Sequence, residues 1–307
     1  MPSCTGKTGD LVLIMPDATY EGKTGDTIFA LLTQPVMVLP QAEATFKVIH
    51  VNKNQVSKLI KKSRNVINTE IDPRIEKPSI TIEKNKYSRP QIYITLKAQN
   101  DSALQSIFLK TSNFIIDTLT HAEQMRYYSF FNQNHESESE LAMRNKHGVK
   151  LMIPYGFNKD VDKDNFVWIS KETSISSQGM LVFDFPYNGP KDFELQHLIG
   201  KIDSVLLKNV PGPQDGSYMT TAKVFEPIKK EYMRGNTYVC ELRGLWETNG
   251  DFMGGPFVSQ SIVDTVNNRL VTNFAYVYGG KNDKRNLLWQ LEGIMNSFEI
   301  WYSNGKN

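Results

Sequence analysis

The order of apolar segments in the second half of the chain is the feature that most restricts its fold. From residue 149 onward, segments with the two-residue alternation of a strand follow one another. Stretches with helical spacing interrupt them near residues 195–206 and close the half near residues 287–298. The predicted strands are 149–153, 166–170, 180–185, 238–246, 257–264 and 270–278. Strands in this order, with helices between and after them, are typical of an α+β fold and not of a parallel βαβ array.

The first half carries a second set of segments with the same two periodicities. The predicted strands are 11–15, 46–51, 65–71, 79–83 and 91–97, and the predicted short helices are 24–33 and 55–62. A long helix is predicted from Asp101 onward, because apolar residues recur there at spacings of three, four and seven; these are Leu104, Phe108, Ile115, Leu119 and Ala122.

Two sub-domains joined by a polar segment are therefore predicted. We expect an N-terminal tether at 1–9, an α+β sub-domain at 10–133, a polar linker at 134–148 and a second α+β sub-domain at 149–303. Both sub-domains are expected to be built on antiparallel sheets with packed helices. His135 and His147 lie in the linker and are expected to be solvated. A length of 307 residues agrees with this division, at roughly 150 residues per domain.

Charge and apolar runs exclude a nucleic-acid partner and a membrane-spanning helix. The chain has 35 Lys and Arg against 33 Asp and Glu, a net charge of +2, so it lacks the basic field that nucleic-acid binding requires. No apolar run approaches the roughly 20 residues of a membrane-spanning helix.

No short motif of the sequence indicates a binding site for a cofactor or a metal. The segment from Asp17 to Thr24 lies between a strand and a helix, as a phosphate-binding loop does, but it has Asp17 where that loop requires glycine. Nucleotide binding is therefore not expected. The five histidines and two cysteines lack the local spacing of a zinc site, and no catalytic residue is assigned. A Ser–His–Asp arrangement stays open, since its members need not be neighbours in sequence.

The two cysteines lie in unlike surroundings. Cys240 belongs to an alternating segment and is expected to be a small buried hydrophobe. Cys4 lies in a polar, Gly-rich stretch. A disulfide between them is the less favoured alternative, because it would tie a flexible end to a strand.

Glycine-rich and aromatic loops surround one predicted strand of the second half. Loops 211–221 and 251–257 bracket the strand that bears Arg243 and Trp246. Such loops on a rigid sheet suit a binding cleft, and Arg and Trp are enriched at binding hot spots. The predicted ligand-binding residues are Ser217, Tyr218, Arg243, Trp246 and Arg285. The alternative is that the glycines only make turns and the aromatic residues fill the interior.

The same stretches carry a resemblance to a known family. The segments 211–213 (PGP), 216–221 (GSYMTT), 241–247 (ELRGLWE) and 250–259 (GDFMGGPFVS) resemble a family of Bacteroidetes envelope lipoproteins, domain of unknown function 4837. The resemblance implies a place in the cell envelope and no activity. More weakly, 151–154 (LMIP) and 296–298 (NSF) make the second half similar to PsbP-like domains, an α/β sandwich used mostly in binding modules.

These observations favour a membrane-anchored, non-enzymatic binding or scaffold protein of the bacterial cell envelope, whose partner is an envelope protein or a glycan. The alternative is an envelope hydrolase that uses paired carboxylates from Glu241, Glu247 and Asp251. Glycoside hydrolysis would require two such carboxyl groups roughly 5 to 9.5 Å apart.

Cys4 is predicted to be the lipidated first residue of the mature protein. The small residue Ser3 precedes it and Met1 occupies the apolar position three before it, as at a lipoprotein cleavage site, although Pro2 departs from the usual pattern. An upstream signal peptide and a lipid anchor to an envelope membrane are then expected. The alternative is an ordinary initiator Met followed by an exposed thiol.

Overall fold

The computed structural model describes residues 1–302, and the chain divides into two compact units. Unit 1 contains residues 1–36 and 42–126, and unit 2 contains residues 37–41 and 127 onward. The short segment 37–41 leaves unit 1 and packs within unit 2, where Leu39 contacts the hydrophobic core. Residue 303, the predicted end of the second sub-domain, lies outside the described residues.

Unit 1 is built on a five-stranded sheet with the order β2-β1-β3-β5-β4. Its strands are β1 (Asp10–Ile14), β2 (Lys47–Val51), β3 (Asn65–Ile71), β4 (Ser79–Lys84) and β5 (Ile92–Ala98). Its helices are α1 (Asp17–Tyr20), α2 (Lys23–Leu32), α3 (Lys58–Lys61), a 3-10 turn at Lys53–Gln55 and most of α4 (Asp101–Gln133). The predicted apolar stripe of α4 is confirmed, since Leu104, Phe108, Ile115 and Leu119 are fully buried.

The α+β class is confirmed, but an antiparallel sheet in the first half is wrong. Strands β1, β2, β3 and β5 are parallel to their neighbours, and only the edge strand β4 is antiparallel. The reason is that helical segments connect β1 to β2 and β2 to β3, and such crossovers return the chain in the same direction. The nearly continuous burial of β3 and β5 is typical of strands in a parallel sheet.

Unit 2 contains an eight-stranded antiparallel sheet, as predicted for the second half. The order is β10-β12-β13-β14-β9-β8-β7, and β11 also pairs with β12. Its strands are β7 (Asn158–Lys163), β8 (Phe166–Glu172), β9 (Ser177–Pro186), β10 (Tyr218–Thr221), β11 (Ile228–Arg234), β12 (Thr237–Asn249), β13 (Gly254–Asp264) and β14 (Arg269–Tyr278). The short strands β6 (Val149–Lys150) and β15 (Glu299–Ile300) pair with each other.

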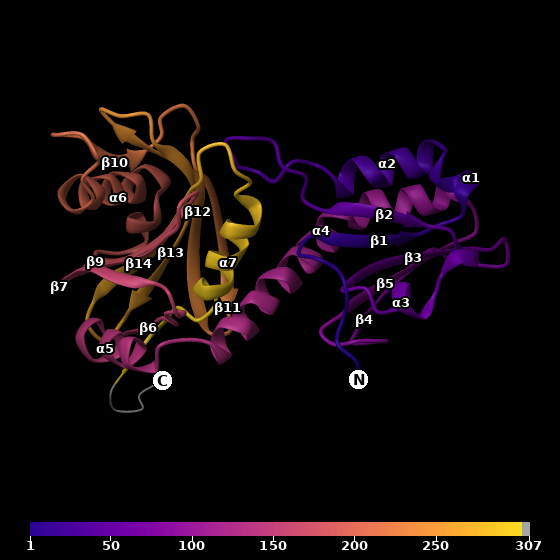
Figure 1. The fold of residues 1–307 in the computed structure, drawn as a ribbon, viewed down its shortest axis with the longest axis horizontal. Coiled ribbons are helices and arrows are strands. Elements are labelled where there is room, and N and C mark those ends of the chain that lie inside the picture. Colours follow the sequence, from indigo (N-terminus) through magenta and orange to yellow (C-terminus); the bar gives the residue numbers. More distant parts are fainter. Residues whose placement is uncertain (303–307) are drawn as a thin grey trace. The chain divides into compact units, whose positions relative to one another are not determined.

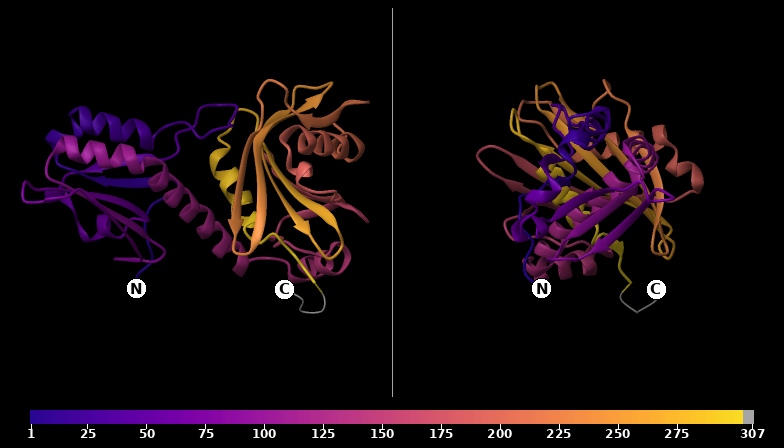
Figure 2. Two further views of the ribbon diagram at one scale, coloured as in Figure 1. Left: turned by 180° about the vertical axis from the view of Figure 1, so that it is seen from behind. Right: turned by 90° about the vertical axis from the view of Figure 1, so that its right-hand side faces the viewer.

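Each face of this sheet packs against its own helix. Helix α6 (Leu195–Asn209), preceded by a 3-10 turn at Pro190–Phe193, covers one face, and α7 (Arg285–Met295) covers the other. Figure 1 and the rear view in Figure 2 show α6 and α7 on opposite sides of the strands. Strand β14 illustrates the alternation that permits this, because Leu270 faces the α6 core while Val271 faces the α7 core.

Two segments expected to be flexible are ordered parts of these units. The predicted polar linker is wrong, because residues 137–147 form helix α5 (Ser137–His147) and Met143 enters the α7 core. A free tether at 1–9 is also wrong, because Cys4 and Thr5 donate backbone hydrogen bonds to the carbonyl oxygens of Arg89 and Lys62. Within the part of the chain that the structure describes, no helix has the length and apolarity needed to cross a membrane.

Candidate functional site

The structure places Arg243 and Trp246 on opposite faces of β12. They are three residues apart, an odd spacing that sends side chains to different sides of a strand. Trp246 is buried in the α6 core, where its Nε1–H donates to the carbonyl oxygen of Val277 over 3.1 Å. Arg243 lies on the α7 side. One ligand therefore cannot contact both side chains without unfolding the strand.

Arg243 is the centre of an ion network between β12 and α7. Its Nε lies 2.7 Å from Glu241 Oε1, and its Nη2 pairs with Glu292 of α7. Burial raises the pKa of Glu241, but Arg243 and hydrogen bonds from Gln260 and Tyr232 outweigh that effect and leave the pKa below its usual value. Burial alone would lower the pKa of Arg243, yet Glu292 and Glu241 raise it. The network holds α7 on the sheet.

The other predicted ligand-binding residues lie on two segments, with Ser217 and Tyr218 at the start of β10 and Arg285 on α7. Ser217 is buried in a turn, where its Oγ donates to the carbonyl oxygen of Gln214 over 2.6 Å. Tyr218 begins β10, and its hydroxyl accepts a hydrogen bond from Asn249. Arg285 lies at the start of α7, with its guanidinium 5.1 Å from the ring centroid of Trp289.

The three carboxylates of the hydrolase alternative do not form a pair around Glu241. Glu247 lies six residues further along the same strand, which corresponds to roughly 20 Å at about 3.3 Å per residue. Asp251 lies in the turn beyond the end of β12, where its Oδ1 accepts the backbone N–H of Phe252. A general acid needs a raised pKa, and the pKa of Glu241 is lowered. This geometry removes Glu241 from the paired-carboxylate mechanism.

Both cysteines are free thiols. Cys240 is fully buried in the α6 core, as predicted, and burial raises the pKa of its thiol to about 11. Cys4 is partly exposed on unit 1. The residues that follow Cys4 lie against a buried ionic cluster, which fixes their path.

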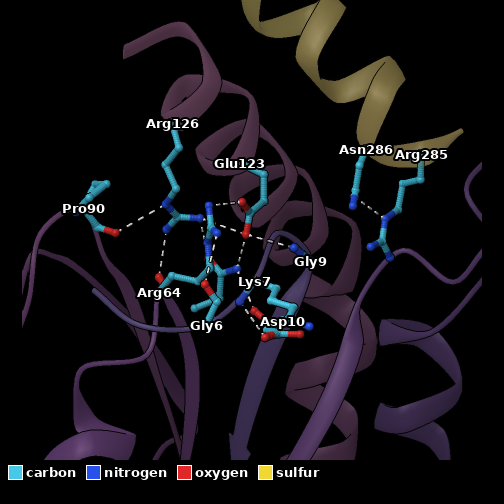
Figure 3. Close-up of polar contacts among 11 residues, drawn as sticks. Gly6, Lys7, Gly9, Asp10, Arg64, Pro90, Glu123, Arg126, Arg285 and Asn286 are labelled. Atoms are coloured by element: carbon cyan, nitrogen blue, oxygen red, sulfur yellow. Dashed lines mark hydrogen bonds and ion pairs between the residues drawn. The ribbon is translucent and has the colours of Figure 1, made fainter. Parts of the chain in front are cut away.

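Figure 3 shows this cluster, in which Glu123 of α4 lies between two arginines. Glu123 is fully buried, and its carboxylate oxygens lie 2.7 Å from Arg64 Nη2 and 3.0 Å from Arg126 Nη1. The backbone N–H of Gly9 donates to Glu123 Oε1 over 3.4 Å. Burial lowers the pKa of Arg126, and Glu123 opposes that effect. The cluster joins the N-terminal segment to β3 and α4.

A pocket of about 310 Å³ lies in unit 2, between α5 and the edge strand β7. Its volume falls at the lower end of the range of small-molecule sites. The floor is formed by apolar side chains, of which four are buried. The apolar residues are Ala142, Met143, Ile153, Phe157 and Ile169. The polar lining residues are Glu136, Glu138, Ser139, His147, Asn158, Lys159 and Asp162.

A β-bulge in β7 sets the polar end of this pocket. The pairing of β7 with β8 shifts register between Lys159 and Val161. In a regular strand Lys159 and Asp162 would point to opposite faces, because they are three residues apart. The extra residue of the bulge brings them to the same face, where Lys159 Nζ lies 2.7 Å from Asp162 Oδ2.

Asp162 is also the residue that joins β7 to the last turn of α5. Its Oδ1 accepts hydrogen bonds from Lys146 Nζ at 2.8 Å and interacts with His147 Nε2 at 2.9 Å. Burial raises the pKa of Asp162, but hydrogen bonds from Lys146, Lys159 and His147 outweigh it and hold the pKa well below its usual range. The imidazole of His147 is 5% exposed, contrary to the expected solvated position.

The two ends of the pocket differ in charge. Glu136 and Glu138 lie at the start of α5, and the Glu136 carboxylate accepts a hydrogen bond from Ser139 over 2.9 Å. Lys159 and His147 lie at the other end, with the apolar floor between. The pocket therefore combines an apolar floor with charged side chains at both ends. Among residues 1–302, no group of three or more His, Cys, Asp or Glu side chains could hold a metal ion.

This pocket is not predicted by the sequence, because residues 134–148 have the polar composition of a linker. The signals were present: Glu138 and Glu140 lie in the first turn of α5, and Lys146 lies in its last turn, where each sign of charge suits the helix dipole. Gly148 follows with φ of +64°, the left-handed conformation that commonly ends a helix.

Comparisons with known proteins bear on the whole chain. The family described as Domain of unknown function (DUF4837) matches residues 135–297, more than half of the chain. The chain belongs to the DUF4837 family. This confirms the predicted family. A second family, Domain of unknown function (DUF8532), matches residues 4–132. The DUF4837 match includes the whole pocket.

Similarity beyond these families is distant. Comparison with curated protein sequences gives no match. The yeast Saccharomyces cerevisiae Ran-binding protein Mog1p shares 10% identity, with a TM-score of 0.34, over 50% of this chain and 90% of Mog1p. LpqN of Mycobacterium tuberculosis, described as involved in cell envelope biogenesis, shares 12% identity with a TM-score of 0.31, over 50% and 83% of the two chains. These scores support no functional argument, and the PsbP-like resemblance stays a prediction.

Proposed function

We propose that this DUF4837 protein is a non-enzymatic binding protein of the bacterial cell envelope. In this proposal a lipid on Cys4 anchors the protein to an envelope membrane, and the pocket between α5 and β7 binds a small amphiphilic ligand. The observation that carries the binding role is the bulge in β7, which places both Lys159 and Asp162 in the lining of the pocket beside its apolar floor. Bulges that redirect side chains are frequent beside functional sites.

The state of the charged side chains favours binding over catalysis. Glu241, Asp162 and Asp264 all have lowered pKa values, because each accepts hydrogen bonds from cationic or amide groups that outweigh the effect of burial. Catalytic acids and bases instead have pKa values tuned toward neutrality. These carboxylates are suited to holding helices and turns in place.

The proposed anchor rests on the residues around Cys4. Ser3 and Met1 fit a lipoprotein cleavage site, and Cys4 is partly exposed, so acyl chains on its sulfur could reach a bilayer. Stable anchoring by acylation commonly needs two chains or one chain with a basic patch. A larger envelope partner, whether a protein or a glycan, would contact a surface outside the small pocket.

The binding role is tested with decanoate as the probe and the methyl group of Met143 as the reporter. Met143 lines the pocket, so its ¹³C-methyl resonance should shift on titration with decanoate. Ala142→Trp should abolish the shift by filling the pocket. Leu141→Trp is the matched control, because Leu141 is the exposed neighbour on α5 and does not line the pocket.

The polar end of the pocket is tested with a second pair of variants. Lys159→Met should weaken decanoate binding at least about tenfold by removing a charge-assisted partner of the carboxylate. Lys163→Met removes the same charge from the same strand, outside the pocket, and should leave binding unchanged. Equal binding by all four variants would contradict the proposed site.

A further inference from the structure

The N-terminal segment of unit 1 passes between two basic elements. The backbone N–H of Thr5 donates to the carbonyl oxygen of Lys62, and that of Cys4 donates to the carbonyl oxygen of Arg89, each over 3.0 Å. Lys62 caps helix α3, and Arg89 lies in the turn between β4 and β5. Ser88 Oγ also donates to the carbonyl oxygen of Lys62, which joins the two elements. The backbone of Cys4 therefore lies between α3 and this turn, and the residue is partly exposed.

That surface concentrates positive charge. Lys58, Lys61 and Lys62 come from the α3 segment, and Arg89 comes from the turn. Lys58, Lys61 and Arg89 are exposed, and none of the four forms an ion pair with a carboxylate of the described residues 1–302. Because the net charge of the whole chain is only +2, such a group of unpaired cations is not an average property of its surface.

Apolar side chains project from the same surface. Leu59 lies between Lys58 and Lys61 and is 65% exposed. Tyr87 is 36% exposed, and the ammonium groups of Lys61 and Lys86 lie 5.7 and 5.6 Å from its ring centroid. Exposed leucine beside lysine, with a tyrosine at the rim, is the composition of protein surfaces that lie at the headgroup level of a bilayer.

We propose that this surface, formed by Lys58, Leu59, Lys61, Lys62, Tyr87 and Arg89, docks onto anionic lipid headgroups around Cys4. We call it the Cys4 patch. The docking gives a function to the basic residues that the pocket does not use. It rests on the proposed anchoring for its role in the cell, but it acts through charge and therefore operates without the acyl chain. Basic residues near an anionic membrane each add to the attraction, and salt screens it.

The fixed position of Cys4 determines which face is presented to the membrane. The segment after Cys4 is held by Glu123 through Gly9 and by Arg64, whose Nη1 donates to the carbonyl oxygen of Gly6 over 3.5 Å. A lipid on Cys4 would therefore bring the Cys4 patch close to the headgroups.

The docking is tested with the full chain carrying Cys4→Ser, so that no acyl chain contributes. Flotation should show binding to vesicles that contain phosphatidylglycerol at least about tenfold stronger than to phosphatidylcholine vesicles, and this difference should fall as salt rises. The added changes Lys61→Gln, Lys62→Gln and Arg89→Gln should remove the difference. The matched control changes Lys171, Lys191 and Lys208 of unit 2 to Gln, removes the same charge and should keep it.

Several results would overturn the Cys4 patch. One is that the variant with Lys61, Lys62 and Arg89 changed binds phosphatidylglycerol vesicles as strongly as the control variant does. Another is that the Cys4→Ser protein binds both kinds of vesicle equally. Tighter binding to soluble heparin than to vesicles would identify a polyanion other than lipid. Circular dichroism of each variant confirms that unit 1 is folded. Because the tested protein cannot be acylated, these results leave the anchoring of Cys4 to be decided separately.

Discussion

Replacing Trp246 with alanine tests whether this residue belongs to the core or to a binding surface. Its side chain is 4% exposed, and its ring packs edge-on against Tyr276 with centroids 5.5 Å apart. Its indole N–H donates to the carbonyl oxygen of Val277. Truncation of a buried tryptophan costs about 3–5 kcal/mol of the free energy of unfolding. For a domain of this size each kcal/mol lowers the melting temperature by about 2–4 °C, so Tm should fall by roughly 6–20 °C.

The assay is thermal unfolding by calorimetry, with Trp246→Phe and Phe252→Ala beside Trp246→Ala. Trp246→Phe keeps most of the ring and loses the hydrogen bond, so it should cost about 1–2 kcal/mol. Phe252 is fully exposed at the turn between β12 and β13, and its truncation should change stability by less than about 0.5 kcal/mol. A Trp246→Ala protein that melts within about 1 °C of the parent would refute the packing described for the α6 core.

Four further outcomes are expected from the same structure. Arg243→Met should cost about 3–5 kcal/mol by leaving buried carboxylates unpaired, measured by urea unfolding. Because the pKa of Glu241 is lowered in the folded state, its ionised carboxylate should contribute fully to the free energy of unfolding above about pH 4.3, and this contribution should be lost as pH falls. A free energy of unfolding of the parent protein that does not change with pH below about 4.3 would contradict this. At pH 8 a thiol reagent should modify Cys4 quickly and Cys240 only after denaturation, since burial raises the Cys240 pKa to about 11; two fast thiols would disprove that burial. Asp162→Asn should cost about 1–3 kcal/mol and loosen the last turn of α5, seen as faster amide hydrogen exchange there and unchanged exchange in α6.

Much of unit 2 could be predicted from the sequence, because its strands have one face toward each helix. Alternating apolar side chains identify such strands without knowledge of their partners. The position of Arg243 and Trp246 on opposite faces of β12 also follows from their spacing of three, whereas the helix that covers each face does not. The ion pair between Arg243 and Glu292 could not be predicted, because Glu292 lies on a helix 49 residues further along the chain.

The errors have identifiable physical causes. The parallel sheet of unit 1 depends on which strands meet in space, and local periodicity reports strands but not their direction. Helix α5 is mostly polar and contributes only a narrow stripe to the core, so composition alone favoured a linker. The bulge that builds the pocket is a property of pairing between β7 and β8, and no residue of β7 marks it.

The most direct test of the proposed function is the intact mass of the protein purified with detergent from membranes of cells that express its full-length natural gene. The mature chain should begin at Cys4 and carry the added mass of a lipid on that residue. Cys4→Ser should move the protein out of the membrane fraction. An unmodified Cys4 thiol, or native protein recovered in the soluble fraction without detergent, would contradict the lipid anchor and the envelope location with it.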